Sequence, residues 1–188
     1  MPHRSYLIVL LAAAAVAHAQ EPGAIMAPPP DSAHPATAPV LFICRGAGAL
    51  KVDGVTTATQ SPHENVHTLE LTGLTPGLHT LEFGGQTLRF SVGPTAENFT
   101  AFKTHPPAAQ CETCHAVRLG RWRFQRVSLA SVCSQCHARE TFQAKHTHEM
   151  QVLTDCQLCH NPHGSTAAQP AHLKLTPKAA CNQCHALP

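Results

Sequence analysis

One stretch near the C-terminus, Cys156-Gln157-Leu158-Cys159-His160-Asn161-Pro162-His163-Gly164-Ser165, determines how half of this chain is interpreted. Its first five residues have the form C-x-x-C-H, and the same form recurs at residues 111–115, 133–137 and 181–185. Four copies use eight of the nine cysteines, and each copy has a histidine directly after its second cysteine. The chain therefore repeats one kind of site four times.

The chemistry of this motif is specific. C-x-x-C-H is the attachment signature of c-type haem. Thiols at positions i and i+3 lie on one side of a helical turn, where they can form thioethers with the two haem vinyl groups, and the adjoining histidine is the proximal iron ligand. The motif predicts four covalent haems held by Cys111, Cys114, Cys133, Cys136, Cys156, Cys159, Cys181 and Cys184. The predicted proximal ligands are His115, His137, His160 and His185.

Two alternatives use the same cysteines. The spacing of the first two pairs also fits a zinc ribbon, but zinc does not require a histidine after each second cysteine. Four disulfides would leave the histidines unexplained, and bridging positions i and i+3 of a helix has poor geometry. Covalent haem is the reading that accounts for all of the residues.

On these motifs, residues 105–188 resemble multihaem c-type cytochromes with doubled C-x-x-C-H motifs, akin to the cytochrome c3 class. The second doublet carries the resemblance: His148 precedes Cys156 by eight residues, and His163 follows in an Asn-Pro-His-Gly-Ser run. The first doublet departs from it, because Ala116-Val117-Arg118 replaces that run. The resemblance implies a mostly irregular, short-helix tetrahaem domain.

Four irons with proximal histidines also need a sixth ligand each. The resemblance implies that His148 and His163 are distal ligands. His105 occupies the comparable place upstream of the first motif, and His146 is the candidate for the fourth iron; in an extended segment His146 and His148 point opposite ways. His172 is held in reserve, and the thioether of Met150 would raise the potential of one haem.

The remaining chain divides into three segments by composition. Residues 1–19 are typical of a secretory signal, with an apolar run at 6–16 and an Ala17-His18-Ala19 cleavage site. Residues 20–39 hold six prolines and are predicted to be an extended linker. Residues 40–93 are predicted to be a small antiparallel β-domain, sandwich-like, followed by the tetrahaem cytochrome c domain at 94–188.

The β-domain prediction rests on alternation and turn signals. Strands are expected at 41–43, 67–71, 79–83 and 87–92, with an Asp53-Gly54 turn within residues 51–55 and Gly84-Gly85 closing a hairpin. This segment loosely resembles immunoglobulin-like modules of secreted proteins. His63, His67 and His79 are expected at its surface, and Cys44 as a buried free thiol, with an intermolecular disulfide as the alternative. Farther along, short helices are expected at 118–127 and 138–145.

The composition also limits the function. A formal charge of +2 gives no electrostatic support for nucleic-acid binding, and after removal of the signal no segment is long enough to span a membrane. Bis-His ligation closes both axial positions, which favours electron transfer over catalysis. The expected protein is a periplasmic or cell-surface electron carrier with transient redox partners and potential self-association. Ionised haem propionates would steer basic partners toward it. The alternatives are a subunit of a conducting cytochrome polymer and a haem reductase with one open iron.

Overall fold

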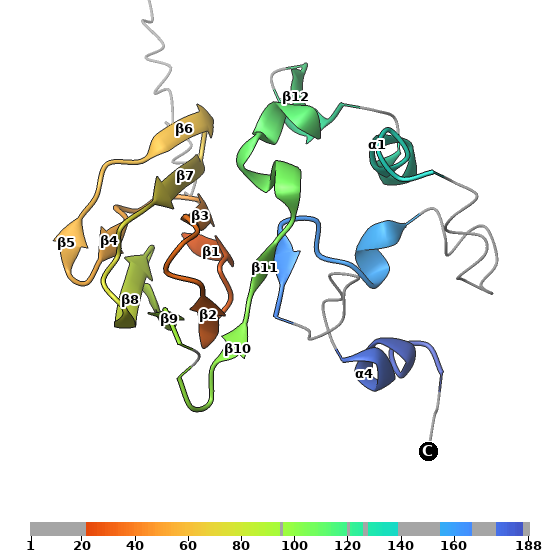
Figure 1. Cartoon of the computed structure of the whole chain (residues 1–188). Coiled ribbons are helices and arrows are strands. Elements are labelled where there is room, and N and C mark those ends of the chain that lie inside the picture. The colour runs from red at the N-terminus through yellow and green to blue at the C-terminus, as the bar shows by residue number, and fades with distance from the viewer. Residues whose placement is uncertain are drawn as a thin grey trace, which may run out of the picture.

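The computed structural model describes residues 22–94, 96–119, 121–125, 128–138, 155–166 and 176–185 (Figure 1). The expected signal segment, His146, His148, Met150, His172 and most of the helix expected at 138–145 lie outside these residues. Within the described part of the chain, no helix is long and apolar enough to cross a membrane.

Two facing β-sheets occupy residues 22–101, here called the two-sheet region. The first sheet has the order β1-β3-β7-β6 and the second β10-β2-β9-β8-β4-β5. The strands of the first are β1 (Ala24–Ala27), β3 (Val40–Arg45), β6 (Gln60–His63) and β7 (Val66–Leu71). Those of the second are β2 (Ser32–His34), β4 (Lys51–Val52), β5 (Val55–Thr56), β8 (Gly77–Phe83), β9 (Gln86–Val92) and β10 (Thr100–Ala101).

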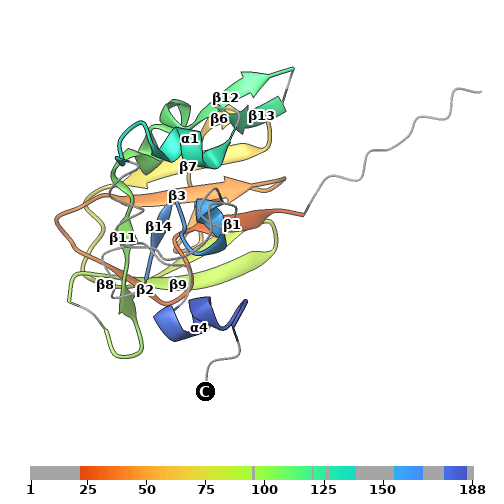
Figure 2. The same cartoon turned by 90° about the vertical axis from the view of Figure 1, so that its right-hand side faces the viewer.

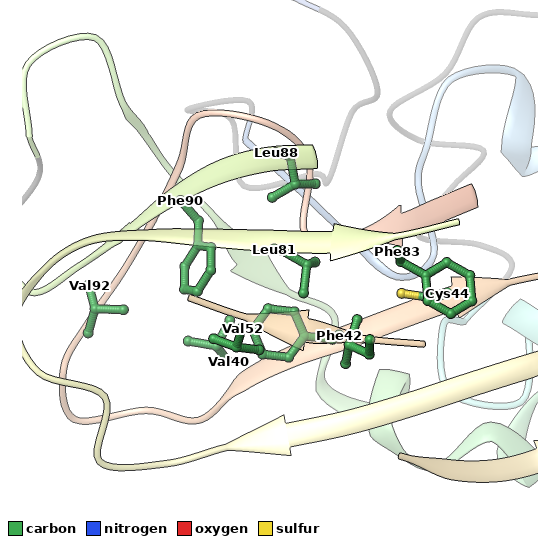
Figure 3. Close-up of a cluster of buried hydrophobic side chains, with 10 residues drawn as sticks. Val40, Phe42, Cys44, Val52, Leu81, Phe83, Leu88, Phe90 and Val92 are labelled. Atoms are coloured by element: carbon green, nitrogen blue, oxygen red, sulfur yellow. The ribbon is translucent and has the colours of Figure 1, made fainter. Parts of the chain in front are cut away.

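The core lies between the sheets because alternate residues of three strands point inward (Figure 3). Its central side chains are Val40, Phe42 and Cys44 of β3, Leu81 and Phe83 of β8, and Leu88, Phe90 and Val92 of β9. Gly84 and Gly85 have φ angles of 56° and 81°, which the tight hairpin turn between β8 and β9 requires. The strands expected from alternation at 41–43, 67–71, 79–83 and 87–92 are therefore present.

The proline-rich stretch differs from the linker predicted for residues 20–39. It contains β1 and β2, and Ser32 is fully buried. β2 pairs in parallel with both β9 and β10, so its backbone groups are satisfied on both sides. The prolines at 28–30 lie between the two strands, and Ala27 and Ala33 are buried. Proline content alone was a wrong guide here.

The chain beyond the sheets consists of short elements. In order they are β11 (Lys103–Thr104), η1 (Pro106–Ala109), η2 (Cys111–Thr113), β12 (His115–Arg118), β13 (Arg121–Phe124), α1 (Leu129–Cys133), η3 (Cys156–Leu158), β14 (Gly164–Ser165) and α4 (Pro177–Cys181). β11 leaves the two-sheet region and pairs with β14, so the two halves of the molecule meet along this ladder (Figure 1).

The helix predicted for residues 118–127 is wrong. The segment forms the antiparallel hairpin β12–β13, with Leu119 in the left-handed region at φ 52°. The hairpin follows a period of two: Val117 opposes Trp122 and His115 opposes Phe124, while Ala116 and three arginines occupy the alternate positions. Aromatic and β-branched residues on one face favour a strand over a helix.

Candidate functional site

All four C-x-x-C-H motifs begin with the same tight turn. In each, the N–H of the second cysteine donates to the carbonyl oxygen of the first, at 3.2 Å in the first, second and fourth motifs. In the last three motifs the histidine N–H donates to that same carbonyl, at 2.9–3.0 Å. The two thiols of each motif are thus one turn apart, the spacing that two thioether bonds to one porphyrin need. All eight motif cysteines are free thiols in this structure.

Local sequence positions these turns. α1 begins at a capping box between Ser128 and Ser131 and ends at Cys133. α4 begins with Pro177 after the N-cap Thr176 and ends at Cys181. In the third motif the Asp155 carboxylate accepts from the N–H of Gln157. In these three motifs, a capped start therefore fixes where the first cysteine falls.

The first motif differs because its histidine begins a strand. The ring of His115 stacks between Trp122 and Phe124, with centroids 5.1 Å and 5.2 Å away. Burial lowers the pKa of His115, although a hydrogen bond to the backbone of Arg123 acts in the opposite direction. Its Nδ1 is buried without a hydrogen-bond partner among the described residues. The two aromatic rings and the backbone of Arg123 thus hold the His115 ring in a fixed orientation.

The candidate distal ligands His105 and His163 meet at the β11–β14 ladder. Thr104 pairs with Gly164, and the His105 N–H donates to the carbonyl oxygen of His163 at 3.4 Å. An Asn turn shapes the second strand: the Asn161 side-chain oxygen accepts from the His163 N–H at 3.0 Å. The ladder therefore carries two candidate ligands side by side.

These two histidines also lie beside proximal candidates. The rings of His105 and His137 have centroids 6.1 Å apart and planes inclined by 41°. Burial lowers the pKa of His163, and the neighbouring His115 and His105 lower it further. The structure thus brings His115 of the first motif and His137 of the second to the ladder that carries His105 and His163.

The motif cysteines show the same gathering. Burial and the adjacent Cys156 raise the pKa of the Cys133 thiol to about 12, and Cys114 lies near Cys136. Among the described residues, no group of three or more His, Cys, Asp or Glu could hold a metal ion. In the fourth motif Cys181, Cys184 and His185 are exposed.

Several residues near this site were not predicted from the sequence. Trp122 and Phe124 flank His115, and alternation in residues 115–124 was the signal for them. The ring of Trp122 also packs on that of His63 in β6, with centroids 5.1 Å apart. This contact joins the hairpin to the edge of the first sheet (Figure 2). His34 is buried beside Phe90 and Phe102.

The histidines expected at the surface of the β-strands are mostly engaged. His79, predicted to be exposed, is buried: its Nδ1 lies 2.7 Å from the Asp53 carboxylate, and its Nε2 donates to the Thr75 carbonyl. His67 is half-buried and hydrogen-bonded to the Gly46 carbonyl. Cys44 is buried and free, as predicted.

Residues 148–187 match the family model for the doubled CXXCH motif. The match supports a multihaem c-type cytochrome. It spans the third and fourth motifs with His148 and His163, and the motif indicates covalently bound c-type haem, which is usually attached outside the cytoplasm. The first two motifs lie outside the matched residues. A comparison with curated proteins found no match.

Proposed function

We propose that the chain is an exported tetrahaem c-type cytochrome that carries electrons through closely spaced bis-His haems. The observation behind this proposal is the turn that all four motifs share, with two free thiols one turn apart and a histidine directly after them. The doubled motif at 148–187 supports haem binding for the last two copies. The first two copies have the same sequence form and the same turn.

The cysteines and the histidines have different tasks in this proposal. Eight cysteines anchor the porphyrins, His115, His137, His160 and His185 hold the irons from one side, and the distal set of His105, His146, His148 and His163 closes the other. When bound, haem supplies one-electron chemistry at its iron. These residues would hold each haem through two thioethers and two imidazoles, so that its iron would not be open to a small ligand.

Short distances between motifs favour transfer from haem to haem. The Cys133 thiol lies against Cys156, and Cys114 lies near Cys136, so porphyrins on the first three motifs would be close neighbours. The short elements there have few buried apolar side chains of their own, and the porphyrins would supply the missing core. This arrangement suits a carrier better than an enzyme, because no iron is left for a substrate.

The polymer alternative would be marked by haem contacts between subunits, or by an iron ligand that His63, His67 or His79 offers to another subunit. His79 is bonded to Asp53 and Thr75, and His63 packs on Trp122. No observation on these residues favours that alternative. Export, for which residues 1–19 are the sequence signal, and transient redox partners remain parts of the proposal.

A reductive titration of the purified mature protein tests the function. Stepwise addition of electrons, followed by the visible spectrum, should take up four electrons per chain with all haems remaining low-spin. Uptake of fewer electrons would contradict the tetrahaem count. Oxidation of the reduced protein by a small oxyanion such as nitrite, with repeated turnover, would instead favour the reductase alternative.

A further inference from the structure

We propose that His105 is the sixth ligand of the iron carried by the second motif, opposite His137, and that the two-sheet region holds it there through residues 100–105. This inference rests on the proposed function, since it needs haem on the second motif. It goes beyond that function by assigning one axial pair, and by giving the two-sheet region a role inside the protein rather than at a docking surface.

The ring geometry fits an iron between the two histidines. Each of two trans imidazoles holds a metal at about 2 Å, and each ring centre lies about 1 Å farther out, so the centres are expected about 6 Å apart. The His105 and His137 centroids are 6.1 Å apart. Their 41° inclination is compatible as well, because each ring can rotate about its bond to iron.

The spacing of ring contacts depends on their geometry, and the edge-to-face pair of His34 and Phe90 has centroids 6.0 Å apart. The other stacked or tilted contacts of histidine rings in the described residues have centroids 5.1–5.3 Å apart. His105 and His137 are separated by nearly an ångström more than these pairs. This spacing is wider than that of the other tilted or stacked pairs and agrees with the distance expected for two rings on either side of one iron.

Sequence proximity would have paired His105 with another motif. His105 is six residues from Cys111 and 28 from Cys133, so the first motif is its nearest neighbour in the chain. The ring of His115, however, stacks on Trp122 and Phe124, and His163, which follows the third motif, is a candidate distal ligand that lies near it. The fold thus directs His105 to the second motif.

Residues 100–105 form a continuous segment, here called the strap, that leads from the second sheet to His105. The Thr100 N–H donates to the Asp31 carbonyl at 2.9 Å, and the Phe102 N–H donates to the Ala33 carbonyl at 2.8 Å. Phe102 is 6% exposed, and its ring packs on the buried ring of His34 with centroids 5.3 Å apart. The next two residues form β11, which pairs with β14.

The pairing of β2 within the second sheet supports the strap. β2 is the strand that pairs with β10 and accepts the Phe102 N–H, so a mobile linker at residues 20–39 would leave the strap without support. Residues 22–34 therefore contribute to the position of a ligand more than seventy residues away.

Carbon monoxide binding to the reduced holoprotein tests the pairing through a double-variant cycle. His105→Ala should open one iron in four, so a quarter of the haem should bind carbon monoxide. Adding His137→Ala should leave that fraction at a quarter, because both residues face one iron. Adding His115→Ala should raise it to half. The matched control His67→Ala should bind none.

Haem attachment provides a second readout. If His137→Ala prevents loading of the second haem, the pyridine adduct will count three haems, and His105→Ala in that background should then add no carbon monoxide binding. A fraction of half for the His105/His137 double variant, or new binding when the second haem is missing, would overturn the pairing. A wild-type chain with fewer than four haems would count against the proposed function instead.

Discussion

Gly164 lies directly against Phe102 where the haem-binding half meets the sheets. A Cβ on Gly164 would lie 2.5 Å from Cζ of Phe102 and 2.6 Å from the Lys103 carbonyl oxygen. Its φ of 137° is also one that side chains rarely adopt. Glycine is thus the residue that lets β14 approach the strap and carry His163 beside His105.

We expect Gly164→Ala to separate β14 from β11 and to displace a distal ligand. The holoprotein should lose about 1–3 kcal/mol of stability, and roughly a quarter of its reduced haem should gain carbon monoxide binding. Gly73→Ala is the control, because Gly73 also has positive φ but no atom within 4 Å of its Cβ position. Equal behaviour of the two variants would show that the contact with Phe102 does not matter.

Trp122 is expected to hold the ring of His115 in place. Trp122→Ala should destabilise the hairpin by about 1 kcal/mol, since a stacked aromatic pair contributes that much beyond area burial. It should also change the reduction potential of one haem, measured by voltammetry, while Trp122→Phe retains most of the wild-type value. Four unchanged potentials in Trp122→Ala would mean that the stack does not influence the ligand.

The Asp53–His79 pair should give the two-sheet region a bell-shaped stability profile. Burial opposes charge on both groups, but their mutual hydrogen bond, with further bonds to Thr80 and Thr75, lowers the pKa of Asp53 and raises that of His79. The Asp53 contribution is lost as pH falls through its lowered pKa. The His79 contribution is present below its ordinary pKa of 6.5 and lost as pH rises through the raised value.

The contribution of the pair is therefore greatest between about pH 4 and 6.5. Asp53→Asn should cost about 1 kcal/mol in this window and less on either side. Hydrogen exchange of the β8 and β9 amides in the holoprotein measures it, with Glu82→Gln as the control, since the Lys51–Glu82 pair is largely exposed. An equal loss of stability at every pH would contradict the electrostatic role.

His34 should destabilise the folded state as the pH falls, because its pKa is lowered rather than raised. Burial lowers its pKa to about 4, so the folded state binds this proton less readily than the unfolded state. Stability should fall as pH drops from 6.5 toward 4, by about 3 kcal/mol at most. His34→Phe should remove this slope in the exchange of β2 and β9 amides. A slope that persists in the variant would place the responsible group elsewhere.

Cys44 should be the one thiol that reacts after unfolding. Burial raises its pKa to about 12, so a thiol reagent should find no reactive group in the folded holoprotein. In denaturant it should find one per chain, and none in Cys44→Ala. More than one thiol per wild-type chain would mean that some C-x-x-C-H cysteines carry no thioether.

Different parts of the molecule were predictable from sequence to different degrees. Leu81, Phe83, Leu88 and Phe90 alternate around Gly84-Gly85, so the β8–β9 hairpin followed from local pattern alone. Residues 24–34 were misjudged because their partners, β3, β9 and β10, lie far along the chain. The helix predicted for residues 118–127 is wrong because the alternation of His115, Val117, Trp122 and Phe124 favours the hairpin β12–β13.

The same distinction applies to the site. The cysteines and proximal histidines follow from a contiguous motif whose turn is local, and their geometry was predictable. The meeting of His105 with His137 and His163 depends on the pairing of Thr104 with Gly164, sixty residues apart. Neither segment carries a local pattern that indicates this strand pairing. The proposed pairing of iron ligands could therefore not be derived from the sequence.

The central claim is that four haems sit on this chain with every iron held by two protein ligands. The most direct test is a haem count as the pyridine adduct, combined with the visible spectrum of the dithionite-reduced protein before and after carbon monoxide. The account predicts four haems per chain and no spectral change with carbon monoxide. A change in about a quarter of the haem, or a count below four, would contradict it.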